Sequence, residues 1–119
     1  MDCPMDKLRL EQLANNDQEI ERELFRVFFK EVDLYIRIMI KAQVSKDDVN
    51  WKETVIRFKA AAVYLGAVHL ADFLSAITEG ANLSNEAKTA QIKVALREVG
   101  KVKEFYEQRL KSTGSENCD

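Results

Sequence analysis

The chain of 119 residues is 46% apolar and 32% charged, with a formal net charge of −2, a composition typical of one soluble globular domain and not of a disordered chain. A nearly balanced charge excludes the basic surface that binding to nucleic acid requires. Because no apolar stretch is long enough for a membrane span and the polar start is no signal peptide, we expect a cytoplasmic protein whose partners include neither nucleic acid nor membrane.

Four glycines and one proline are too few for the turns of a sandwich or barrel, so long helices are favoured. Apolar spacing and capping residues predict five helices, over about 6–14, 17–43, 49–65, 67–78 and 84–111, with Gly66 and Gly80 ending the third and fourth. We therefore predict an all-α fold, an antiparallel four-helix bundle with a short additional N-terminal helix. It forms one domain over residues 1–111, and a flexible tail covers 112–119.

The second predicted helix carries apolar residues at the three-and-four spacing of an amphipathic helix, and we expect them to face the core. These residues are Ile20, Leu24, Val27, Phe28, Leu34, Tyr35 and Ile38.

The two cysteines, Cys3 and Cys118, lie in the polar ends of the chain, where we expect reduced thiols. No second cysteine or histidine stands beside either of them at ligand spacing, and the sequence has no phosphate loop or other catalytic motif. We expect neither a metal nor another cofactor.

The third predicted helix has two apolar faces when its residues are placed about 100° apart. One face is a regular buried stripe, formed by Trp51, Val55, Phe58, Ala62 and Leu65. The opposite face carries Ile56, Ala60 and Val63, with Lys52 and Lys59 beside them. An apolar, small, apolar row there predicts either a contact surface for a partner or a central helix that buries Ile56 within the protein, and periodicity does not separate the two.

Residues 56–70 resemble the signature of histidine-containing phosphotransfer (HPt) domains, His-x-Leu-Lys-Gly-Ser-Ser/Ala-x-x-Leu-Gly-Ala-x-x-Leu. The positions that fit are Phe58, Lys59, Ala62, Leu65, Gly66, Ala67 and Leu70. Ala60 stands where the family has glycine, Ala61 where it has serine, and Ile56 where it has the phosphorylated histidine. The resemblance extends more loosely over residues 6–110.

The resemblance implies a four-helix bundle that displays this position outward, where a response-regulator receiver domain docks. It also implies that the small residue, here Ala60, leaves room for the partner and that the lysine, here Lys59, faces the phosphoryl group. Isoleucine has no ring nitrogen to attack phosphorus, so phosphotransfer at Ile56 is excluded by its chemistry.

These observations predict a non-enzymatic, pseudo-phosphotransfer protein of a two-component phosphorelay. It would bind a receiver domain, and as a second partner a sensor kinase, through Ile56, Lys59, Ala60, Val63 and Lys52. We expect a monomer, with a homodimer as the alternative. Two other functions stay open: an active phosphotransfer protein that uses His69, the single histidine, or an unrelated helical bundle that forms a homo-oligomer. His69 lies at the edge of the apolar face of its predicted helix, near Asp72 and Phe73.

Overall fold

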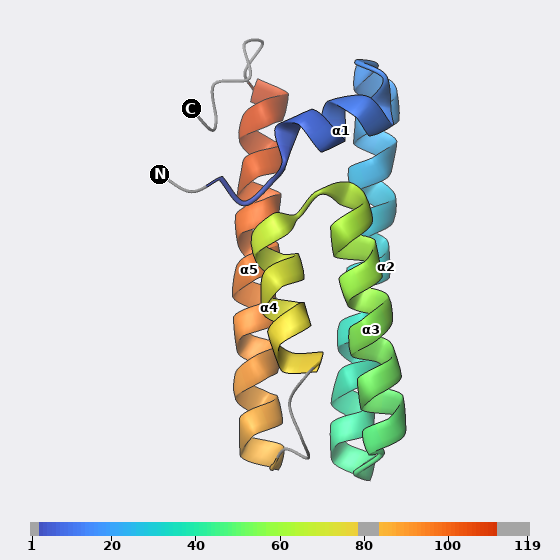
Figure 1. Ribbon diagram of the computed structural model, residues 1–119, viewed down its shortest axis with the longest axis vertical. Helices are drawn as coiled ribbons and strands as arrows, with labels where there is room; N and C mark the ends of the chain where they lie inside the picture. The colour runs from blue at the N-terminus through green and yellow to red at the C-terminus, as the bar shows by residue number, and fades with distance from the viewer. Residues whose placement is uncertain (1–2, 79–83, 112–119) are drawn as a thin grey trace.

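The computed structural model describes residues 3–78 and 84–111, and its secondary structure in these ranges is helical. Five helices follow along the chain: α1 (Lys7–Ala14), α2 (Gln18–Ser45), α3 (Asp48–Leu65), α4 (Val68–Thr78) and α5 (Asn85–Lys111). The last four run side by side in alternating directions, and α1 crosses one end of the bundle (Figure 1). The predicted all-α, antiparallel four-helix bundle with an additional N-terminal helix is confirmed. The role expected of Gly80 and the expected tail, 112–119, lie outside the described residues.

Short polar side chains begin the helices, as their positions in the sequence predict. The carboxylates of Asp6, Asp17 and Asp47 accept backbone N–H groups at the starts of α1, α2 and α3. The hydroxyl of Ser84 accepts the backbone N–H of Ala87 at 3.1 Å and so caps α5. Each cap satisfies a donor that has no partner within its helix and contributes about 1 kcal/mol.

Gly66 ends α3 in the left-handed conformation, with φ of 90°. Its N–H donates to the carbonyl of Ala62 at 3.0 Å, and its own carbonyl accepts the N–H of Asp6 at 2.7 Å. Arg9 Nε donates to the carbonyl of Tyr64 at 3.1 Å. These bonds attach the start of α1 to the elbow between α3 and α4, and they satisfy carbonyls that the end of α3 would otherwise leave unpaired.

Replacing Gly66 by alanine should lower the free energy of unfolding by about 1–3 kcal/mol, because a side chain in this conformation is strained. An added Cβ would also lie 3.2 Å from the carbonyl oxygen of Asp6 and 3.1 Å from Cγ of Arg9. Urea denaturation followed by circular dichroism measures the loss. Gly100→Ala is the control: its Cβ meets nothing within 4 Å, and alanine should stabilise this helical position. Equal effects of the two substitutions would contradict the explanation.

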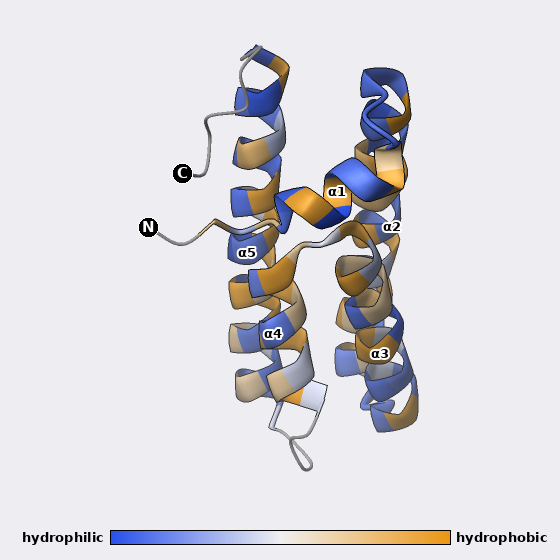
Figure 2. Cartoon of the chain, turned by 45° about the horizontal axis from the view of Figure 1, so that its top comes forward, coloured by the Kyte–Doolittle hydropathy of each residue, from blue (hydrophilic) through white to orange (hydrophobic). Residues whose placement is uncertain are grey.

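The core lies along the axis of the bundle and draws on all five helices. All five residues predicted for the inward stripe of α3 are buried, so this prediction is confirmed. Phe58 stacks on Tyr35 with ring centroids 5.5 Å apart, and Phe25 stacks on Tyr106 at 4.4 Å. Apolar and polar residues alternate along the helices (Figure 2), as amphipathic packing requires.

The prediction for the inward face of α2 is largely wrong. Of the seven apolar residues expected there, only Phe28 is buried; Leu24, Tyr35 and Ile38 are half-buried, and the remaining three are exposed. The buried residues of α2 are Phe25, Phe28, Val32, Ile36, Met39 and Ala42. This helix carries two apolar stripes side by side, and three-and-four spacing does not show which one meets the bundle.

A buried lysine joins α5 to α3 at the far end of the bundle from α1. Lys88 is 3% exposed; its ammonium pairs with the carboxylate of Asp48 and lies 5.3 Å from the ring centroid of Trp51. Nearby, Gln43 Nε2 donates to the backbone carbonyl of Asn85 at 2.8 Å. These contacts join the starts of α3 and α5 to the end of α2.

The expectation of reduced thiols is wrong for Cys3, which is disulfide-bonded. Its position in a polar segment of the sequence gave no information about what lies next to it in space. The same expectation for Cys118 falls outside the described residues. Among the helices of residues 3–78 and 84–111, none combines the length and the apolar character that crossing a membrane needs.

Candidate functional site

The outward face of α3 is open to solvent. Ile56 is 47% exposed and Val63 is 52% exposed, and Ala60 lies between them on the surface. The alternative in which a central α3 buries Ile56 within the protein is therefore wrong. The inward stripe fixes the rotation of α3 and thereby turns this row outward. Whether a partner binds there stays a prediction.

The two lysines predicted beside this row differ in their surroundings. Lys52 is exposed, whereas Lys59 is half-buried. Neither takes part in an ion pair among residues 3–78 and 84–111. Their charges are therefore available to an anionic group on a partner. We call the surface formed by Ile56, Ala60, Val63, Lys52 and Lys59 the α3 face.

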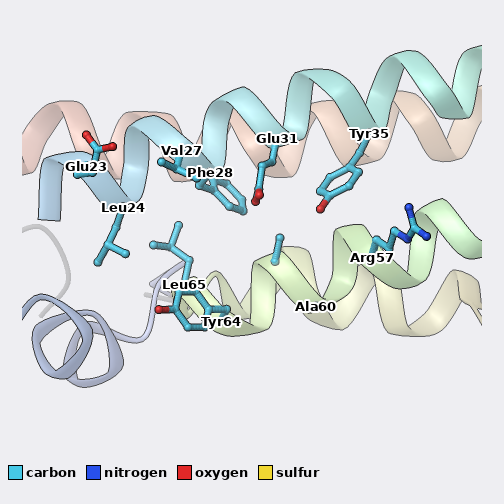
Figure 3. Close-up of a pocket in the computed structure, with 11 residues that line it drawn as sticks. Glu23, Leu24, Val27, Phe28, Glu31, Tyr35, Arg57, Ala60, Tyr64 and Leu65 are labelled. Carbon is cyan, nitrogen blue, oxygen red and sulfur yellow. The ribbon is translucent and has the colours of Figure 1, made fainter. Parts of the chain in front are cut away.

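A groove of about 560 Å³ lies between α2 and α3 and reaches the α3 face at Ala60. Side chains of the two helices point toward one another across it (Figure 3). It is lined by Glu23, Leu24, Val27, Phe28, Glu31, Tyr35, Arg57, Ala60, Ala61, Tyr64 and Leu65. Two consecutive alanines of α3 leave the space open, because a methyl group cannot fill the gap between neighbouring helices. Residue spacing did not predict this groove, although the adjacent alanines Ala60 and Ala61 indicate a gap on this side of α3.

Charged groups stand around the phenol of Tyr35 in the groove. Burial, and then the carboxylate of Glu31, raise the pKa of Tyr35 above its ordinary value of 10.0, while the guanidinium of Arg57 acts in the opposite direction. Neither Glu31 nor Arg57 forms an ion pair with another described residue. The groove thus combines an apolar floor with an unpaired acid on α2 and an unpaired base on α3.

Replacing Glu31 by glutamine should lower the pKa of Tyr35 toward 10.0, and Arg57→Gln should raise it further. Because the folded state holds the phenol proton more tightly than the unfolded chain, this group's contribution to stability is full below pH 10 and is lost as the pH rises through the folded pKa. Absorbance titration of the phenolate measures the shifts, with Tyr35→Phe to assign the signal. Shifts in the same direction for both variants would contradict the arrangement.

His69 lies near the start of α4 and is half-buried, which agrees with the predicted boundary position. It does not line the groove, and the described residues show no ion pair between it and Asp72. Its use as a phosphate acceptor stays a prediction.

The α3 face and the groove carry few reactive side chains among the described residues. Neither contains histidine, cysteine or serine among its described residues, so neither offers the usual protein nucleophiles apart from lysine, carboxylate and phenol. Across residues 3–78 and 84–111, no group of three or more histidine, cysteine, aspartate or glutamate side chains is arranged to hold a metal ion.

No family model, curated protein or solved structure matches this chain.

Proposed function

We propose that the chain is an HPt-like, pseudo-phosphotransfer protein of a two-component phosphorelay that binds a response-regulator receiver domain without carrying phosphate. One observation carries the proposal: the row Ile56, Ala60 and Val63 is exposed at positions where a simple bundle helix would carry lysine, glutamate or glutamine. In the signature that residues 56–70 resemble, this row includes the position of the phosphorylated histidine.

Each part of the α3 face has a role in this proposal. Burial of the exposed part of Ile56 by a partner contributes on the order of 1–2 kcal/mol. Ala60 lets the partner backbone come close, and Lys59 and Lys52 attract its phosphoryl group. Since Ile56 offers no lone pair, the phosphoryl group stays on the partner, and the protein acts as a competitor or scaffold.

Isothermal titration against the phosphorylated receiver domains of the source organism tests the proposal. We expect one or more of them to bind, and we expect Ile56→Asp to weaken that binding by about tenfold or more, because it places a carboxylate in an apolar contact. Leu96→Asp is the matched control, since Leu96 is similarly exposed but lies on α5. Absence of binding to every receiver domain, or equal effects of the two variants, would refute the proposal.

The proposal places the protein in the cytoplasm, with a sensor kinase as a second partner. Cell fractionation tests this location, and recovery of the protein in the cytoplasm supports the proposal. The disulfide at Cys3 predicts a different, oxidising compartment, because disulfides are rare in the cytosol, and recovery there would count against the proposal.

The competing function is phosphotransfer through His69, which is the single histidine and is partly accessible. Exposure to a phosphorylated receiver domain followed by mass spectrometry at alkaline pH, which preserves phosphohistidine, would then give an adduct that His69→Gln abolishes. Under the leading proposal no adduct forms.

A further inference from the structure

The second apolar stripe of α2 lies on the surface of the bundle. We define the α2 outer stripe as Ile20, Leu24, Val27, Glu31, Leu34 and Ile38. Its members follow one another at alternating steps of four and three residues, which is the spacing of the seam of a two-helix coiled coil. Ile20, Val27 and Leu34 are exposed, and Leu24 and Ile38 are half-buried. The stripe spans about 27 Å along the helix.

The stripe is symmetric about Phe29. Its members pair off at equal distances before and after this residue, so a two-fold axis there would bring each member against another member in a second, antiparallel copy of α2. The resulting contacts are Ile20 with Ile38, Leu24 with Leu34, and Val27 with Glu31. In a parallel arrangement every member would meet itself, and two Glu31 carboxylates would face one another, which costs free energy. The sequence of the stripe therefore favours the antiparallel arrangement.

The charges beside the stripe are complementary in the same arrangement. Glu23, Lys30 and Arg37 form the neighbouring row of α2 at seven-residue intervals. An antiparallel copy brings Glu23 close to Arg37 of the second copy, and the two-fold axis repeats this pair. Their present partners, Arg26 and Asp33, are exposed neighbours on the same helix, and such pairs contribute little. Lys30 would approach its own copy near the axis, but it would also approach Glu31 of the second copy, which offsets the repulsion.

The groove between α2 and α3 leaves space for side chains of a second helix. Leu24, Val27 and Glu31 belong to the α2 outer stripe and also line the groove. Opposite them, Ala60 presents only a methyl group, so side chains of a helix lying along the stripe have space between α2 and α3.

We infer that the chain forms a two-fold symmetric dimer in which the α2 outer stripes of two copies pack antiparallel. This inference does not rest on the proposed function, and it replaces the expectation of a monomer. A single seam of this length with Glu31 inside it makes a weak dimer, which forms and separates with protein concentration.

Sedimentation equilibrium of the full chain, up to about 1 mM, tests the inference. We expect reversible dimers, and we expect Leu34→Glu to lower the association constant by about tenfold or more. Leu96→Glu is the matched control: Leu34 is 54% exposed and Leu96 is 48% exposed, but Leu96 lies on α5, so its substitution should leave the constant unchanged. A chain that stays monomeric over the whole range overturns the inference, as does an equal loss in both variants.

Substitutions in the stripe and in the charged row beside it test the packing of the two copies further. Glu31→Leu should strengthen the dimer, because it removes a carboxylate from the apolar seam, although loss of the contact between Glu31 and Lys30 of the second copy reduces the gain. A lower association constant for this variant would contradict the place of Glu31 in the seam. Glu23→Arg and Arg37→Glu should each weaken it, and the double exchange should restore the original constant, since it recreates both pairs with opposite sign. A double exchange that weakens the dimer by the sum of the single effects would overturn the antiparallel arrangement.

Discussion

Replacing Phe58 by alanine should lower the free energy of unfolding by about 3–5 kcal/mol. Phe58 has no exposed surface and stacks on Tyr35 with ring centroids 5.5 Å apart. Its removal leaves a cavity between α2 and α3, the helices whose packing fixes both the core and the outward rotation of the α3 face. Urea denaturation followed by circular dichroism measures the change.

Ile56→Ala is the matched control for Phe58→Ala, because Ile56 lies on the same helix, two residues earlier, and points outward. We expect it to change the free energy of unfolding by no more than about 0.5 kcal/mol, as surface substitutions usually do. A loss near that of Phe58→Ala would mean that Ile56 belongs to the core, and the α3 face would then lose its central residue.

Asp48→Asn should cost about 2 kcal/mol of stability, which is less than the 3–5 kcal/mol typical of breaking a fully buried pair. The pair is buried on one side only: the side chain of Lys88 is 4% exposed, whereas that of Asp48 is 59% exposed. Removal of the carboxylate leaves a buried ammonium that still lies over the neutral ring of Trp51, a contact too weak to replace the ion pair. Chemical denaturation at several salt concentrations measures the loss.

Lys88→Met tests the same pair from the other side and should cost less than about 1 kcal/mol. Methionine keeps most of the apolar stem that packs beside Trp51. The carboxylate of Asp48, which then has no ammonium partner, is exposed and can be solvated by water. If Lys88→Met is the more damaging of the two, the ammonium contributes net stability and the burial argument is wrong.

The inward face of α3 could be predicted from the sequence, because its large apolar residues fall on one narrow stripe. Its opposite face contains an alanine between two β-branched residues. This pattern singles out Ile56 and Val63, but the spacing alone left open whether they are exposed or buried. The helix boundaries were also predictable, since Asp17, Asp47 and Gly66 stand at helix ends where local hydrogen bonds and backbone conformation decide.

The sequence did not identify the inward face of α2, because this helix has apolar residues over more than half of its circumference. Only the positions of the neighbouring helices decide that Phe25 and Val32 are buried and that Val27 and Leu34 are exposed. The burial of Lys88 could not be predicted from the sequence for a related reason. A lysine on a helix is normally solvated, and its carboxylate partner lies forty residues earlier in the chain. The groove likewise depends on how two helices pack, which residue spacing within one helix does not report.

The attachment of α1 to the elbow has a consequence for local unfolding. The bonds from Asp6 to Gly66 and from Arg9 to Tyr64 make the first turn of α1 part of the hydrogen bonding at the end of α3. Opening this end of α1 therefore uncovers two carbonyls of the elbow at the same time, so the two segments share one opening free energy. We therefore expect α1 to open together with the end of α3 and not to fray separately.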